Sequence, residues 1–145
     1  MTERARPELR TNYRHVLPIQ TRWADNDAYG HINNVVYYSW FDTVVNHYLI
    51  ASGALDIERS PVIGLVVETR CSYFSELAFP HPVEAALRVA RIGSSSVRYE
   101  IGLFAAGALS ASAQGHFIHV YVDRATRKPA PLPAALRAAL ERIHA

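Results

Sequence analysis

The sequence of 145 residues has one cysteine, Cys71, so no disulfide can form within the chain and a thiol-rich metal site is not expected. Charged residues are also scarce, at 19% of the chain against roughly 25% in an average soluble domain. No stretch approaches the about 20 apolar residues that a membrane-spanning helix requires. The shortage of charge suggests that part of the surface is buried in an oligomer.

The net charge of +2 is too small to indicate a nucleic-acid-binding surface. Residues 1–14 are polar and lack the apolar segment of a secretory signal, so we expect a cytoplasmic protein without a nucleic-acid or membrane partner. Hydrophobic residues make up 50% of the chain, which is enough for one domain with a real core. We expect a polar, frayed N-terminal arm at residues 1–13 and a single domain at residues 14–145.

The spacing of apolar residues predicts a long helix that begins at Asn33 or Asn34 and ends at Ser52-Gly53. Asparagine is a favoured N-cap because its side-chain oxygen accepts a hydrogen bond from a free backbone N–H, so Asn33 and Asn34 are both candidates for this role. The broad apolar stripe indicates that the helix packs against a sheet. Its members are Tyr37, Trp40, Phe41, Val44, Val45, Tyr48 and Leu49.

Five segments have the composition of strands, and the last four of them alternate apolar and polar residues. They span residues 15–22, 62–74, 83–91, 97–103 and 109–122. Tight turns join the later strands, which predicts antiparallel pairing. A basic loop at residues 124–133 and a short helix at residues 133–144 follow. The sequence therefore predicts an α+β fold, with a five-stranded antiparallel sheet, one long helix covering a face of it and a short C-terminal helix.

The densest group of polar residues precedes the long helix and includes Asp25, Asp27 and His31. A helix N-terminus presents unpaired N–H groups and a partial positive charge, which stabilise an oxygen that becomes anionic. A carboxylate beside it can act as a base or a nucleophile on a carbonyl compound. Aspartate and asparagine are also ordinary turn residues, so spacing alone does not decide between the two roles.

The segment DNDAYGHINN at residues 25–34, followed by Tyr37 and Asp42, resembles the 4-hydroxybenzoyl-CoA thioesterase family. This family is the Asp-dependent branch of the hot-dog-fold acyl-CoA thioesterases, and the resemblance covers roughly residues 14–128. No glutamate lies between Asn33 and Ser52, which favours this branch over the one that uses a helix glutamate. The resemblance implies a sheet wrapped around the long helix. It also implies a homodimer with its sheets joined edge to edge, or a dimer of dimers (homotetramer), with active sites at the subunit interface.

The resemblance further implies that Asp27 attacks the thioester carbonyl or activates a water molecule. Asn34 is expected close to the thioester, where its own backbone N–H or that of Val35 polarises the carbonyl. Asp25 is expected to brace the loop as an Asx-turn residue. The expected substrate-binding residues beside them are Gly30, His31 and Tyr37.

Basic residues after the last strand, Arg127 and Lys128, are candidates for binding the phosphates of CoA, although a solvated surface loop is the favoured interpretation for either residue alone. Arg88, Arg91 and Arg98 are further candidates. His116 and His119 lie three apart on a strand and therefore on opposite faces, so they do not form a metal site. No metal or cofactor is expected, since CoA is part of the substrate.

The sequence thus predicts an acyl-CoA thioesterase, without indicating whether the acyl group is aromatic or aliphatic. Two alternatives share the fold. One is an acyl-CoA or acyl-carrier binding module without turnover, against which Asp27 argues because a pure binder needs no carboxylate beside a thioester. The other is a dehydratase, for which His31 is the only nearby candidate for a catalytic histidine.

Overall fold

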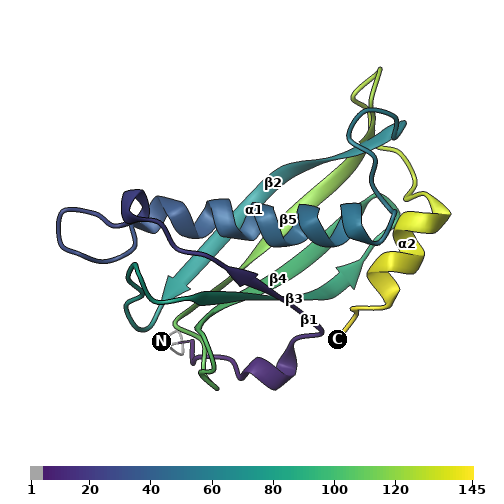
Figure 1. Cartoon of the computed structure of the whole chain (residues 1–145). Helices are drawn as coiled ribbons and strands as arrows, with labels where there is room; N and C mark the ends of the chain where they lie inside the picture. Colours follow the sequence, from purple (N-terminus) through teal and green to yellow (C-terminus); the bar gives the residue numbers. More distant parts are fainter. Residues whose placement is uncertain (1–4) are drawn as a thin grey trace, which may run out of the picture.

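The computed structural model describes residues 5–145 and shows a sheet that carries one long helix on its inner face (Figure 1). The helix α1 spans Asn34–Ala51, and the short helix α2 spans Ala134–Glu141. The strands are β1 (His15–Ile19), β2 (Val62–Tyr73), β3 (Val83–Ile92), β4 (Ser96–Ala105) and β5 (Ala113–Asp123). They pair antiparallel in the order β1-β3-β4-β5-β2, which confirms the predicted fold class.

Helix α1 begins where the sequence predicts, but its N-cap is Asn33. The side-chain oxygen of Asn33 accepts a hydrogen bond from the N–H of Val35 at 3.1 Å. Of the two candidate caps the structure therefore uses Asn33, and Asn34 is the first helical residue rather than the cap. The helix ends at Ala51 and is followed by the C-cap Ser52 and by Gly53, whose φ of 76° lies in the left-handed region that favours glycine after a helix.

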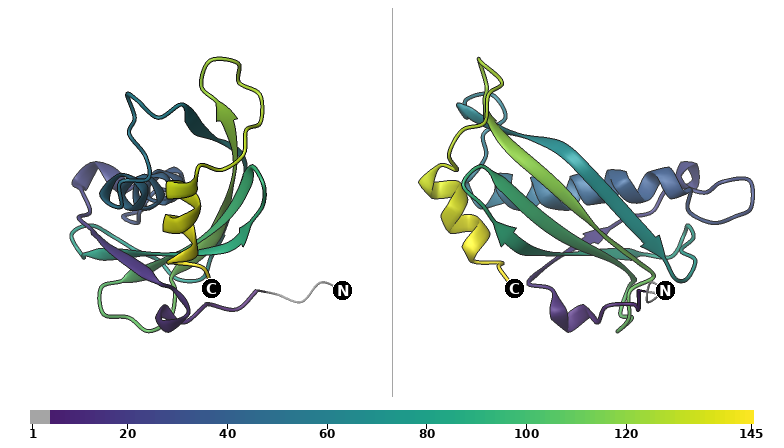
Figure 2. Two further views of the ribbon diagram at one scale, coloured as in Figure 1. Left: turned by 90° about the vertical axis from the view of Figure 1, so that its right-hand side faces the viewer. Right: turned by 180° about the vertical axis from the view of Figure 1, so that it is seen from behind.

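The core lies between α1 and the inner face of the sheet, which bends around the helix (Figure 2). Every residue of the predicted helix stripe is buried. The alternation predicted for the third and fourth strands is also confirmed, because their inward side chains are buried. These side chains are Val83, Ala85, Leu87 and Val89 on β3 and Val97, Tyr99, Ile101 and Leu103 on β4. No helix within residues 5–145 is long and apolar enough to cross a membrane.

Strand β2 forms one edge of the sheet and is largely exposed over its twelve residues. Its apolar side chains Leu65, Val66 and Val67 are 39%, 47% and 60% exposed. A bulge between Val66 and Glu68 interrupts its pairing with β5. The structure therefore leaves a long strand with its outer backbone groups unpaired and apolar side chains in solvent.

The N-terminal segment packs on the outer face of the sheet. Residues 1–4 of the predicted arm lie outside the described residues, whereas residues 5–13 are packed rather than frayed. The N–H of Arg10 donates to the carbonyl of Leu109 at 2.9 Å, and Tyr13 is only 7% exposed. The Tyr13 ring meets the Phe104 ring edge-on at 5.9 Å between centroids. This burial of an aromatic ring offsets the entropy cost of ordering the segment.

Two strand glycines accommodate close neighbours of different kinds. A Cβ added at Gly115 would lie 1.8 Å from the carbonyl oxygen of Arg70 on β2, whereas one at Gly102 would meet the side chains of Tyr13 and Phe104 at 2.8 Å. We expect Gly102→Ala to cost about 1–3 kcal/mol, as overpacking usually does. Gly115→Ala should cost more, because two paired backbones cannot separate without loss of their hydrogen bonds. Urea unfolding of both variants checks this order, which an equal loss would contradict.

Candidate active site

The loop before α1 is held by the buried carboxylate of Asp25, which is 1% exposed. One oxygen accepts from the backbone N–H of Arg22 at 2.8 Å, and the other accepts from its guanidinium at 2.8 and 3.1 Å. The carbonyl of Asp25 accepts from the N–H of Asn33 at 2.8 Å. Asp25 therefore joins the start of the loop to the helix N-cap. The expected bracing role is present, although its partner is Arg22 rather than an Asx turn.

The Asx turn is made instead by Asp27. Its Oδ1 accepts from the N–H of Tyr29 at 2.8 Å, and its backbone N–H donates to the carbonyl of His31 at 2.8 Å. Gly30 allows this tight turn with a φ of 84°. The carboxylate is half-buried, and within residues 5–145 its Oδ2 has no hydrogen-bond partner. One oxygen thus fixes the orientation of the group while the other is free for a ligand.

A cavity of about 570 Å³ lies beside this turn, at the N-terminal end of α1. It brings together four of the predicted site residues, which lie on the loop and the first helical turn. These are Asp27, His31, Asn34 and Tyr37. Gly30 is absent from the wall and acts through the shape of the turn. The remaining wall comes from the end of β2 and the residues after it, namely Tyr73, Phe74, Ser75 and Glu76, together with Tyr29 and Ile32.

The helix N-terminus supplies one available donor at this cavity. The N–H of Val35 is engaged by the Asn33 side chain, so of the two expected donors it is the less available. Asn34 is the first helical residue, and its N–H has no acceptor among the residues that the structure describes. The Asn34 N–H is therefore the donor that remains available to a ligand, and the partial positive charge of the helix N-terminus adds to its attraction for a negative oxygen.

Two wall residues that sequence reasoning missed contact the predicted ones. Glu76 Oε2 lies 2.9 Å from Nε2 of His31, which links the Asp27 loop to the segment after β2. Tyr73 packs edge-on against Tyr37 at 5.0 Å between ring centroids. Burial raises the pKa of both tyrosines, so their hydroxyls stay protonated at neutral pH. Both missed residues are some forty positions away from the motif, and no local pattern marks them.

The thiol of Cys71 lies on β2 near these tyrosines. Burial raises its pKa to about 11, so the group is a thiol rather than a thiolate at neutral pH. A nucleophilic role for this cysteine is therefore disfavoured. Among residues 5–145, no three His, Cys, Asp or Glu side chains gather in an arrangement that could hold a metal ion.

Arg127 and Lys128 are exposed in the loop after β5, far from Asp27 in the same chain (Figure 1). This loop follows Asp123, which pairs with Val62 at the start of β2, whereas the cavity lies at the opposite end of β2. A strand of this length separates the two by about 35 Å. One chain alone does not bring the predicted phosphate-binding residues to the predicted catalytic carboxylate.

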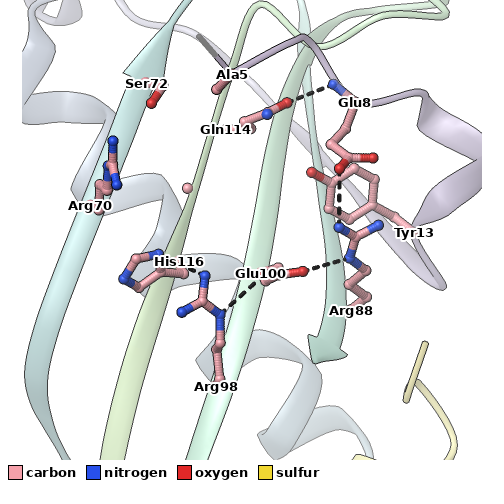
Figure 3. A pocket seen from close by; sticks show the side chains of 11 residues that line it. Ala5, Glu8, Tyr13, Arg70, Ser72, Arg88, Arg98, Glu100, Gln114 and His116 are labelled. Atoms are coloured by element: carbon pink, nitrogen blue, oxygen red, sulfur yellow. Dashed lines mark hydrogen bonds and ion pairs between the residues drawn. The ribbon is translucent and has the colours of Figure 1, made fainter. Parts of the chain in front are cut away.

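A second hollow, of about 330 Å³, lies on the outer face of the sheet and is lined by charged side chains (Figure 3). Arg88 contacts Glu100 at 2.9 Å and Glu8 at 3.4 Å, and Arg98 contacts Glu100 at 3.1 Å. These ion pairs tie the N-terminal segment to β3 and β4. Because the guanidinium groups of Arg88 and Arg98 are paired on the face away from α1, they are poor candidates for binding CoA at the Asp27 cavity.

The comparisons with known proteins agree with this geometry. A family model described as the thioesterase-like superfamily matches residues 21–140. A comparison with curated proteins gave no match.

Among solved structures, the PA5185 protein from Pseudomonas aeruginosa strain PAO1 is 52% identical, with a TM-score of 0.94, over 97% of this chain and 98% of that one. The PA2801 protein, a putative thioesterase from Pseudomonas aeruginosa, is 27% identical, with a TM-score of 0.80, over 88% and 98% of the two chains. The fold is shared with Slr0204, a 1,4-dihydroxy-2-naphthoyl-CoA thioesterase from Synechocystis, at 16% identity and a TM-score of 0.78 over 86% and 93%. With its hot-dog architecture and a family match over most of its length, the chain belongs to the thioesterase-like superfamily.

Proposed function

We propose that the protein hydrolyses an acyl-CoA thioester to the free acid and CoA, with Asp27 as the reacting carboxylate. The observation that carries this proposal is a cavity lined by both Asp27, whose Oδ2 has no partner, and Asn34, whose backbone N–H is unpaired at the helix N-terminus. A carboxylate and an oxyanion donor are two of the groups that acyl transfer requires at one site. Membership of a thioesterase-like superfamily supports the thioester as the bond that is cleaved.

In the proposed reaction the thioester oxygen accepts a hydrogen bond from the Asn34 N–H as negative charge develops on it. Asp27 either removes a proton from the attacking water or attacks the carbonyl carbon itself. In the second case it forms an anhydride that water then opens. The CoA sulfur leaves as a thiolate and takes up a proton. One such donor typically contributes about 10²–10³ to kcat and a positioned base about 10²–10⁴. The proposed chemistry uses water and side chains, without a metal or a cofactor.

The remaining wall residues suit substrate positioning. The His31–Glu76 contact holds the two loops at the cavity together, and the Tyr37–Tyr73 pair provides an aromatic surface for the acyl group. Gly30 keeps the Asp27 turn tight. We therefore assign His31 and Tyr37 to substrate binding and Gly30 to the shape of the loop.

We further propose that the active unit is a homodimer joined through the β2 edges, alone or within a dimer of dimers. The support is the exposed edge of β2 with its apolar side chains. A two-fold axis near the middle of β2 pairs this strand with its own copy in antiparallel fashion. The start of β2 in one copy then lies beside the end of β2 in the other. This arrangement brings the Arg127–Lys128 loop of the second copy towards the Asp27 cavity.

Replacement of Asp27 tests the reacting group. Asp27→Asn can still accept the hydrogen bond from the Tyr29 N–H, so the turn and the fold should survive. Because an amide cannot act as a base at neutral pH, kcat should fall by about 10²–10⁴. A thiol-release assay across aromatic, short-chain and long-chain acyl-CoA esters measures it.

Asp25→Asn is the matched control. It weakens a buried, charge-assisted set of hydrogen bonds and should lower stability by about 1–3 kcal/mol, with a smaller loss of turnover per folded molecule. Wild-type turnover in Asp27→Asn would contradict the proposed role. If the wild-type protein binds acyl-CoA tightly and hydrolyses no ester, a binding module is the right function.

The basic loop gives a second test. Removal of both charges in Arg127→Ala/Lys128→Ala should raise KM for acyl-CoA and leave kcat nearly unchanged, because binding energy common to the ground and transition states is lost. Added salt should weaken wild-type binding in the same way. Steady-state kinetics measures both constants. The control is Arg14→Ala, which removes an exposed arginine just before β1, the strand at the opposite edge of the sheet. An unchanged KM in the double variant would leave the loop as a solvated surface.

The dimer is tested through the exposed strand edge. Val67→Lys places a positive charge near the proposed two-fold axis, where it faces its own copy, so the dimer should dissociate and activity should fall with it. Light scattering combined with the thiol-release assay measures both. Ala135→Lys, on the exposed side of α2, should change neither. A fully active monomer of the wild-type protein would refute the assembly.

A further inference from the structure

A third cavity, of about 280 Å³, lies between the middle of α1 and the first half of β2, apart from the Asp27 cavity. Most of its wall is aliphatic, with Leu49 from α1, Leu55 and Ile57 from the segment after it, and Ile63 and Val66 from β2. Asp42 and Asn46 stand on the helix side. The walls suit an apolar group, and only a few polar atoms lie among them.

His119 of β5 lines this cavity and is 5% exposed. Its Nε2 is buried and has no hydrogen-bond partner within residues 5–145. The ring packs among Tyr99, Phe117 and Tyr121, with centroids 5.0, 5.6 and 6.1 Å away. Burial lowers the pKa of His119 to about 4, so the imidazole is neutral at neutral pH. A buried polar ring without a partner reduces stability unless something else satisfies it.

The position of the proton on this ring follows from its surroundings. An unpaired buried N–H is more unfavourable than an unpaired acceptor, so the enclosed Nε2 carries no proton and Nδ1 carries it. A Cβ added at Gly64 would lie 3.0 Å from Nδ1, and Gly64 itself lines the cavity. The same Cβ would lie 2.9 Å from the Tyr121 ring, so the rings of His119 and Tyr121 pack directly against the Gly64 backbone. Of the two ring nitrogens of His119 only Nε2 is fully enclosed without a partner, so the Nδ1–H is the donor that the ring presents at the cavity wall.

The charges around the cavity limit which acceptor suits this donor. Arg124 donates from its guanidinium to the carbonyls of Ser60 at 2.7 Å and Ile57 at 2.6 Å, which fixes the guanidinium at the wall of the cavity. Asp42 contributes a carboxylate, one oxygen of which accepts from Asn46 at 3.0 Å. The charges of Asp42 and Arg124 balance one another on the wall, so a second carboxylate inside the cavity would leave it with a net negative charge. The complementary atom is a neutral oxygen.

We propose that this cavity binds the end of the acyl group remote from the thioester, and that His119 selects acyl groups carrying a hydroxyl or oxo oxygen there. The inference rests on the proposed function and names its substrate class. Pairing of two β2 edges places the Gly64 end of one copy beside the Tyr73 end of the other. The cavity of one copy then extends the Asp27 cavity of its partner, and an acyl chain can occupy both.

The test compares CoA esters that differ in one oxygen. Hexanoyl-, octanoyl- and decanoyl-CoA are each set against the ester of the same length hydroxylated at its last carbon. At the length that reaches His119, wild-type kcat/KM should be about tenfold higher for the hydroxylated ester, the worth of one well-placed hydrogen bond. Equal kcat/KM values for both members at every length would overturn the proposal.

The variant His119→Phe keeps a ring and removes the donor. It should abolish the preference, so that kcat/KM for the hydroxylated ester falls to the value for the plain ester of the same length. Its melting temperature should rise by a few degrees, because an unpaired polar group leaves the core. His116→Phe, on the opposite face of β5, is the control and should keep the preference. His119→Gln retains an N–H donor and should keep part of the preference for the hydroxylated ester. This variant provides the test if the phenylalanine variant does not fold.

The outcomes separate the two proposals. If wild type hydrolyses plain esters as fast as hydroxylated ones, or if His119→Phe slows both equally, His119 is a structural residue and the thioesterase proposal stands. If no ester of any kind is hydrolysed, the proposed function itself fails.

Discussion

The carboxylate of Asp25 connects the two ends of the loop that carries Asp27. It is buried, it is bound through both oxygens to Arg22, and its own carbonyl holds the N–H of Asn33. Asn33 in turn caps α1, so the same set of bonds fixes the loop and the direction in which the helix leaves it. The position of Asp27 relative to the helix N-terminus depends on this connection. A buried acid that takes no part in the proposed chemistry thus sets the geometry of the one that does.

Much of the fold follows from the periodicity of the sequence. The stripe of α1 and the alternation on β3 and β4 are local signals, since each residue is buried by an element whose own pattern is visible. The packing of the N-terminal segment could not be predicted from such local patterns. Tyr13 looks like part of a polar arm because the surface that buries it, Phe104 and Ala111 with Ala86, comes from distant strands. The absence of a side chain at Gly102 leaves room for the Tyr13 ring, but the sequence around Gly102 does not indicate this contact.

The candidate site likewise contains residues that a local motif predicts and residues that only the tertiary structure brings in. Asp27, Asn34 and His31 lie within eight residues of one another, and their local motif places them at one cavity. Tyr73 and Glu76 reach that cavity through the pairing of β2 with β5 and the turn that follows, which no local pattern encodes. The alternation of a strand does predict that His116 and His119 face opposite sides, as they do. It does not predict that the inward one lies at the edge of a cavity without a partner, because that depends on how far α1 reaches over the sheet.

The free edge of β2 has a consequence for the solution behaviour of the single chain. Its twelve residues carry unpaired backbone groups and a run of exposed aliphatic side chains from Leu65 to Val67. An exposed apolar edge of this kind is a template on which another extended chain can add as a further strand. A chain with this edge uncovered is therefore prone to edge-to-edge association, and the tendency grows with protein concentration. The bulge at Val67 breaks the regular spacing of the edge and so makes stacking with foreign strands less favourable.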